Sequence, residues 1–145
     1  MKWTAAIAVA LLACLGLLWW HEMRSFGVRQ RRDAIAVIER FHQHFNDRDF
    51  DKICEEAFGC TGSERVRSGW NSVLQEVGDR AGKFRGVKSS DIKAYIEPFS
   101  VRADYVCSFE KTDVKEIFIL KRFDEGQLRI LSYQTVTNAL GVPSQ

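Results

Sequence analysis

The sequence predicts an α+β fold in which an N-terminal transmembrane or signal helix precedes three helices packed on one face of a curved four-stranded antiparallel sheet. Three observations predict it. The first twenty or so residues are apolar with almost no interruption. Apolar residues then recur at spacings of three and four, and from Phe84 onward at a spacing of two. About 110 residues remain after the leader, which is the size of one ordinary domain.

Residues 1–23 are the predicted signal anchor or signal peptide. Lys2 precedes an uncharged stretch from Trp3 to Trp20. As a helix this stretch would span roughly 27 Å, close to the hydrocarbon thickness of about 30 Å. Tryptophans at both ends match the aromatic belts found at headgroup level. We expect the segment to contact membrane lipid.

Three fates of this leader are open. No small-residue cleavage site follows Trp20, which favours an uncleaved anchor. The stretch from Leu11 to Cys14 resembles a bacterial lipobox, and in that interpretation Cys14 would be lipidated, although apolar residues continue after it. A cleaved secretory signal is the third alternative.

Residues 24–32 are predicted to form a basic linker, and they bear on which side of the membrane the domain lies. Their arginines outnumber Lys2 on the other flank, which favours a cytoplasmic-facing domain. Cys54 and Cys60 favour the opposite side, because they are close enough in sequence to form a disulfide, and disulfides persist in oxidising compartments. The prediction is an inner-membrane anchored chain with an extracytoplasmic (periplasmic) domain, and a cytoplasmic-facing domain is the alternative.

The soluble domain is assigned to residues 33–137, with residues 138–145 as a C-terminal tail. Apolar residues from Ala34 to Phe45 form the stripe of a first amphipathic helix. A turn at residues 46–49 supplies helix-capping side chains for a short second helix that ends before Gly59. Ser63 can cap a third helix whose apolar face runs to Val77.

The second half of the domain is predicted to be an antiparallel sheet. Alternating apolar residues define strands at 92–96, 99–109, 114–123 and 128–136. Short connections such as Asp124-Glu125-Gly126 imply that consecutive strands are antiparallel neighbours.

The third of these strands is apolar on both faces. Ile117 and Ile119 share one face, and Phe118 and Leu120 share the other. With helices covering one face, we expect the other to meet a second copy or a protein partner, with Phe118 and Leu120 as the predicted interface. A central position in a strongly curved sheet is the alternative explanation.

Several kinds of chemistry are not predicted. The net charge is +2, and the 21 basic and 19 acidic residues are interspersed, which disfavours a nucleic-acid partner. His42 and His44 are two apart on a helix, so they cannot bind one ion together; both are expected to be partly exposed structural residues. The cysteines lack C-x-x-C spacing, and no phosphate-binding loop occurs. We therefore predict no metal site and no cofactor.

The order of elements resembles the nuclear transport factor two-like, or cystatin-like, superfamily, and within it small exported bacterial domains of unknown function. The resemblance covers about residues 33 to 137, and it rests on residues 46–50, Trp70, the stretch from Gly78 to Arg85, and the strand segments 105–109 and 126–130.

This resemblance implies a cone-shaped pocket. In isomerase-like and cyclase-like members an aspartate base and tyrosine donors lie among apolar walls, and Asp104, Tyr95 and Tyr133 would be the counterparts here. Asp104 alternates with Arg102 on the polar face of its strand, however. The predicted function is therefore a binding or assembly domain without catalytic activity, and a small-molecule isomerase or cyclase is the alternative.

Overall fold

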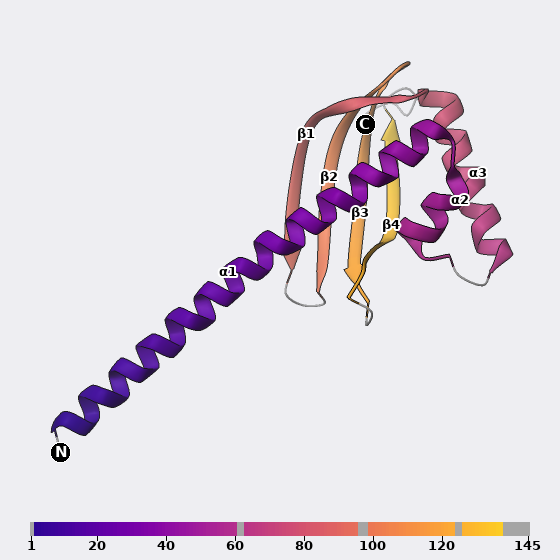
Figure 1. Ribbon diagram of the computed structural model, residues 1–145. Coiled ribbons are helices and arrows are strands. Elements are labelled where there is room, and N and C mark those ends of the chain that lie inside the picture. Colours follow the sequence, from indigo (N-terminus) through magenta and orange to yellow (C-terminus); the bar gives the residue numbers. More distant parts are fainter. Residues whose placement is uncertain (1, 61–62, 96–98, 124–125, 138–145) are drawn as a thin grey trace, which may run out of the picture.

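A computed structural model shows one long helix crossing one face of a four-stranded sheet, with shorter helical segments beside it (Figure 1). The structure describes the backbone of residues 2–60, 63–95, 99–123 and 126–137. Side chains are described for these residues apart from 2–12 and 23.

The sheet is an antiparallel meander whose strands lie in chain order. Its strands are β1 (Phe84–Tyr95), β2 (Ser100–Phe109), β3 (Asp113–Arg122) and β4 (Leu128–Thr137). The predicted α+β arrangement is confirmed. The strand expected at 92–96 is part of the longer β1, whose polar first half is held by pairing with β2 despite two register shifts.

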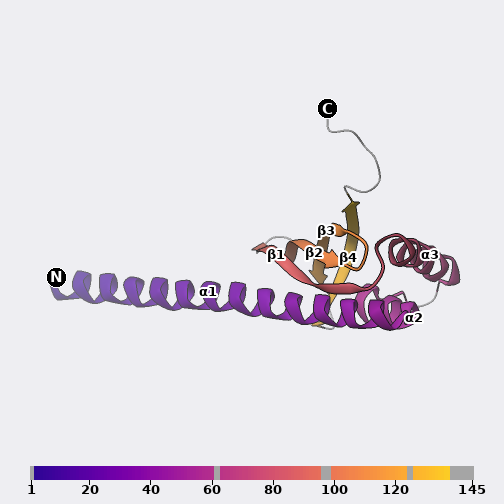
Figure 2. The same ribbon diagram turned by 90° about the horizontal axis from the view of Figure 1, so that it is seen from above.

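Helix α1 (Lys2–Asp47) is continuous from the leader into the domain. The basic segment at residues 24–32, predicted to link the leader to the domain, is helical and forms part of α1. Arginine and glutamine are good helix formers, and the single Gly27 costs only about 1 kcal/mol relative to alanine. The C-terminal half of α1 lies diagonally across the sheet, and its N-terminal half extends past the β1 edge (Figures 1 and 2).

The core lies between the C-terminal half of α1 and the inner face of the sheet. The ring of Phe41 packs against Phe118 and Tyr133, with centroids 5.3 and 5.0 Å apart. Phe118 and Leu120 are fully buried in this core. Their predicted role as a surface interface is therefore wrong, because alternation along β3 turns them toward α1. Ile117 and Ile119 are the apolar residues of β3 that lie on the outer face.

The other helical segments pack beyond the end of α1. They are α2 (Phe50–Lys52), which Asp49 caps as predicted, the π-helical turn η1 (Ile53–Phe58) and α3 (Glu64–Ala81). Cys54 and Cys60 form a disulfide with their Cα atoms 5.2 Å apart. It joins η1 to the residues that follow it.

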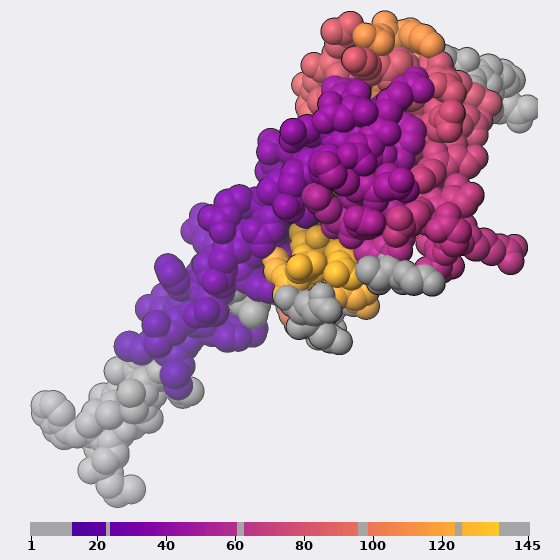
Figure 3. All heavy atoms as spheres, turned by 45° about the vertical axis from the view of Figure 1, so that its right-hand side comes forward, coloured from indigo at the N-terminus to yellow at the C-terminus, as the bar shows by residue number. Residues whose placement is uncertain are grey.

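The N-terminal half of α1 presents apolar side chains to solvent. In the described part of the chain, no helix has a stretch long and apolar enough to cross a membrane. The expected span runs from Trp3 to Trp20, and the side chains of its residues 3–12 lie outside the described part of the chain. The described remainder stands clear of the domain body (Figure 3), and Cys14 within it is an exposed free thiol.

Replacing Cys54 and Cys60 together by alanine should lower the free energy of unfolding by about 2 kcal/mol, because the bond closes a short loop and restricts the unfolded chain. Urea unfolding of the variant and the wild type measures the difference. Cys14→Ala is the matched control and should have no effect on stability, since Cys14 is exposed. Equal stability of the double variant and the wild type would contradict the prediction.

Candidate functional site

The most unusual residue of the core is Glu116, a carboxylate with no exposed surface. Alternation along β3 places it on the inner face between Val114 and Phe118. Burying an unpaired carboxylate costs several kcal/mol. Glu116 avoids this cost through two short contacts: its Oε1 accepts a hydrogen bond from the Tyr133 hydroxyl, and its Oε2 lies 2.7 Å from His42 Nε2.

His42 reaches Glu116 from α1, four residues after Ile38 on the apolar stripe. The expectation that it would be partly exposed is wrong, since only 4% of the residue is exposed. A residue distant in sequence covers His42: the ring of Phe84 at the start of β1 stacks on the imidazole, with centroids 3.9 Å apart. His44, by contrast, points toward Glu56 on the surface, so the two histidines diverge as their spacing predicts.

Tyr133 reaches the same carboxylate because β4 is irregular. Pairing with β3 shifts between Ile119 and Leu120, so that Leu131 is left outside the ladder and is 56% exposed. Such a bulge reverses the facing of the residues after it. Ile130 before the bulge and Tyr133 after it are consequently both buried.

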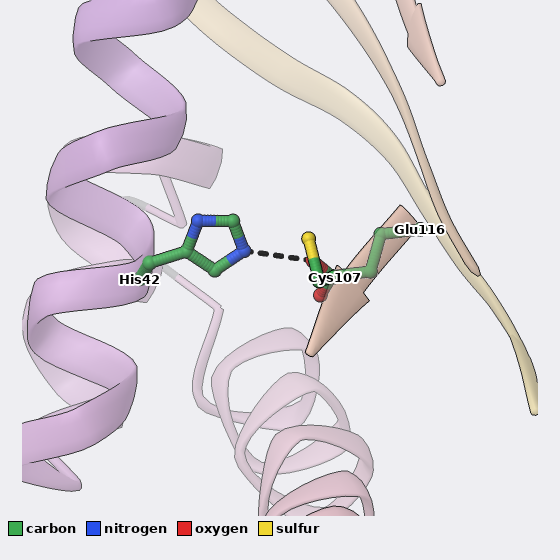
Figure 4. A group of neighbouring side chains, drawn as sticks. All are labelled: His42, Cys107 and Glu116. Atoms are coloured by element: carbon green, nitrogen blue, oxygen red, sulfur yellow. Dashed lines mark hydrogen bonds and ion pairs between the residues drawn. The ribbon is translucent and has the colours of Figure 1, made fainter. Parts of the chain in front are cut away.

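Cys107 of β2 completes this group, which we call the buried polar cluster (His42, Cys107, Glu116 and Tyr133). Figure 4 shows the thiol of Cys107 beside the Glu116 carboxylate. Burial, and secondarily the carboxylate, raises the pKa of the Cys107 thiol and the pKa of the Tyr133 phenol. Both groups therefore stay protonated at neutral pH, and the thiol is a poor nucleophile.

A cavity of about 570 Å³ lies between α1 and β1. Ile35 and Ile38 contribute its apolar wall on the helix, and Val87 contributes on the strand. His42 and Tyr105 also border it, so the imidazole links this cavity to the buried polar cluster. A largely apolar concavity with a few polar groups is the usual form of a small-ligand site.

The residues proposed for an isomerase-type site are not brought together. Asp104 and Tyr95 border a pocket of about 730 Å³ at the β1–β2 part of the sheet, whereas Tyr133 is buried under α1. Bidentate hydrogen bonding from the Arg102 guanidinium lowers the pKa of Asp104. A general base needs a raised pKa instead. The Asp104, Tyr95 and Tyr133 set is therefore corrected: alternation along β2 directs Asp104 away from the core.

Comparisons with known proteins support the fold. No protein-family model matches the chain, and no curated protein matches it in sequence. Among solved structures it is similar to ActVI-ORFA from Streptomyces coelicolor, with a TM-score of 0.55 and 16% identity over 76% of this chain and 98% of that chain. The chain therefore shares the fold of that protein, which agrees with the fold that the sequence resemblance implied. At this identity the likeness establishes the fold alone.

This fold places the buried polar cluster where α1 and the sheet face each other, a site that the sequence analysis missed. One signal was present: Glu116 falls at an inward position of β3, in the series Val114, Glu116, Phe118 and Leu120. A charged residue at such a position needs partners in the core. Nothing in the sequence pattern identified His42 and Tyr133 as those partners.

The two buried tyrosines should make the protein sensitive to alkali. Burial raises the pKa of Tyr105 to about 12, and burial beside Glu116 raises the pKa of Tyr133 well above its ordinary value. In the unfolded chain both phenols lose their protons near pH 10 or so. Above that pH the folded state binds more protons than the unfolded state. The free energy of unfolding should then fall by up to about 1.4 kcal/mol per pH unit for each phenol.

Urea unfolding at several pH values between about 9 and 11 measures this slope. Tyr133→Phe should make the slope shallower, because one of the two phenols is removed. Tyr95→Phe is the control at an exposed tyrosine and should leave the slope unchanged. A stability that does not fall over this range would contradict the assignment.

Proposed function

We propose that the chain is a membrane-anchored, extracytoplasmic binding domain without catalytic activity. The observation that supports this most directly is the N-terminal half of α1. Between Leu15 and Trp20 it displays five large apolar side chains that are 61–70% exposed. Contiguous apolar surface of this kind marks a contact with a membrane or a partner. The stretch from Trp3 to Trp20 has the length and the tryptophan ends that a bilayer requires.

The contact between Phe26 and Phe99 supports a domain seated close to the membrane surface. Phe26 follows Trp20 by six residues, about 9 Å along a helix. Its ring meets the ring of Phe99 edge-on, with centroids 6.0 Å apart. Phe99 is 53% exposed and has a φ of 53°, a strained conformation for a bulky residue. In the proposed orientation Phe99 faces the lipid headgroups.

The disulfide between Cys54 and Cys60 supports the extracytoplasmic side. Such bonds are rare in reducing compartments, and in the proposal this outweighs the adverse arginine count after the leader. Lipidation of Cys14, whose thiol is exposed, is the alternative means of attachment. Alkylation of all four cysteines in cell extracts denatured without reductant would instead place the domain in the cytoplasm.

Binding is favoured over catalysis by the state of the core carboxylate. Among the described cavities, none is bordered by Glu116. A small apolar ligand in the cavity between α1 and β1 would instead meet the imidazole of His42 and the walls around it. A protein partner or second copy is proposed to use the outer face of the sheet, where Ile117 and Ile119 lie.

Leu15→Arg should weaken membrane attachment, because an arginine inside the span costs up to about 3 kcal/mol. The measurement is the fraction of the full-length chain that stays with the membrane pellet after an alkaline carbonate wash. Val28→Arg is the matched control, since Val28 is 64% exposed but lies beyond the span. Complete extraction of the wild-type chain, or an equal loss in both variants, would contradict the anchor.

A small-molecule isomerase or cyclase is the second candidate, and one observation favours it. His42 borders the cavity and contacts Glu116 at the same time, while Tyr105 borders the cavity opposite the helix. In this hypothesis His42 is a general base oriented by Glu116, and the Tyr105 hydroxyl donates a hydrogen bond to a developing enolate.

Deuterium exchange separates the two candidates. A general base in the cavity should promote exchange of the proton next to the carbonyl in an apolar unsaturated ketone, measured by mass spectrometry in heavy water. The binding proposal predicts no exchange above the uncatalysed rate, for the wild type and for His42→Gln alike. Exchange that disappears in His42→Gln and persists in Tyr95→Phe would favour the enzyme.

A further inference from the structure

Three side chains of metal-binding type meet inside the buried polar cluster. His42, Cys107 and Glu116 come from α1, β2 and β3, and all three are buried (Figure 4). Their ligand atoms, the imidazole nitrogen, the thiol sulfur and a carboxylate oxygen, all lie within 4.8 Å of one another. Elements far apart in sequence therefore present one nitrogen, one sulfur and one oxygen to the same small volume.

The geometry points to a site for a divalent transition-metal ion at His42, Cys107 and Glu116, with Zn²⁺ as the best-matched ion. Zinc accepts imidazole, thiolate and carboxylate ligands together, and it has no strong geometric preference. Harder ions such as Mg²⁺ and Ca²⁺ prefer sites made wholly of oxygen ligands. The mixed donor set selects against them.

Charge balance allows such an ion to enter the core. In its uncharged form the cluster holds two exchangeable protons, one between His42 Nε2 and Glu116 Oε2 and one on the Cys107 thiol, which hydrogen bonds to Glu116. A divalent cation that replaces both protons leaves the net charge at zero. The site thus avoids the large cost of an uncompensated buried charge.

The distances require only local adjustment. At metal–ligand distances of roughly 2.0–2.3 Å, neighbouring ligand atoms of a tetrahedral zinc site are about 3–4 Å apart. The present separations run from the 2.7 Å hydrogen bond between His42 and Glu116 up to 4.8 Å. Side-chain shifts of about 1 Å bring the three atoms to these distances.

Tyr133 and the neighbouring cavity complete the site. The Tyr133 hydroxyl donates to Glu116 Oε1, which leaves Oε2 for the metal and orients the carboxylate. Outer hydrogen bonds of this kind commonly tune metal affinity by about 10–100-fold. His42 borders the cavity between α1 and β1, which provides a path from solvent.

Cobalt titration of the full chain in detergent micelles tests the site, because Co²⁺ bound to a thiolate gives a charge-transfer absorption band that Zn²⁺ abolishes on displacement. We expect one equivalent of Co²⁺ to produce this band. The disulfide leaves Cys14 and Cys107 as the free thiols. Cys14→Ala should therefore keep the band, and Cys107→Ala should lose it while remaining folded by circular dichroism.

A further measurement distinguishes a built site from a chance thiol contact. Tyr133→Phe should keep the band and weaken Co²⁺ binding by about 10–100-fold. A wild-type chain without the band, a band lost in Cys14→Ala, or a band retained in Cys107→Ala would each overturn the proposal.

Discussion

The Glu116 carboxylate in the middle of an aromatic core is the constraint on which the rest of the domain depends. Left unpaired there, it would cost more than a small domain can tolerate. Its two partners come from different elements, His42 from α1 and Tyr133 from β4. Because Glu116 contacts both partners at once, these two contacts set how α1 is rotated over the sheet and which residues of β4 face inward. The polar cluster thereby specifies the packing of the apolar residues around it.

The order of helices and strands was predictable from sequence because each element keeps its own spacing of apolar residues. The partners of Glu116 were not. Strict alternation from Leu128 and Ile130 would turn Tyr133 outward, and only the bulge at Leu131 turns it inward. A bulge depends on how two strands pair, and the local sequence pattern does not show it. His42 was missed for a related reason, since the strand that covers it begins 42 residues later at Phe84.

Helix α1 is continuous although its two halves differ in surface character. From Ala34 onward α1 has an apolar stripe, which is typical of a helix lying on a core, whereas before Trp20 it is apolar on every side. Local propensity allows the residues between them to continue the helix, so a change of surface character does not become a change of backbone. A composition boundary in a sequence is therefore weak evidence for a structural hinge.

Continuity of α1 also relates the cavity to the proposed anchor. His42 follows Trp20 by 22 residues, which places the imidazole about 33 Å further along a straight helix. With Trp20 at headgroup level, the cavity between α1 and β1 opens well outside the bilayer. A ligand of that cavity, or an ion bound by His42, Cys107 and Glu116, would then arrive from the aqueous phase. The proposed anchor would thus hold the site near the membrane without exposing it to lipid.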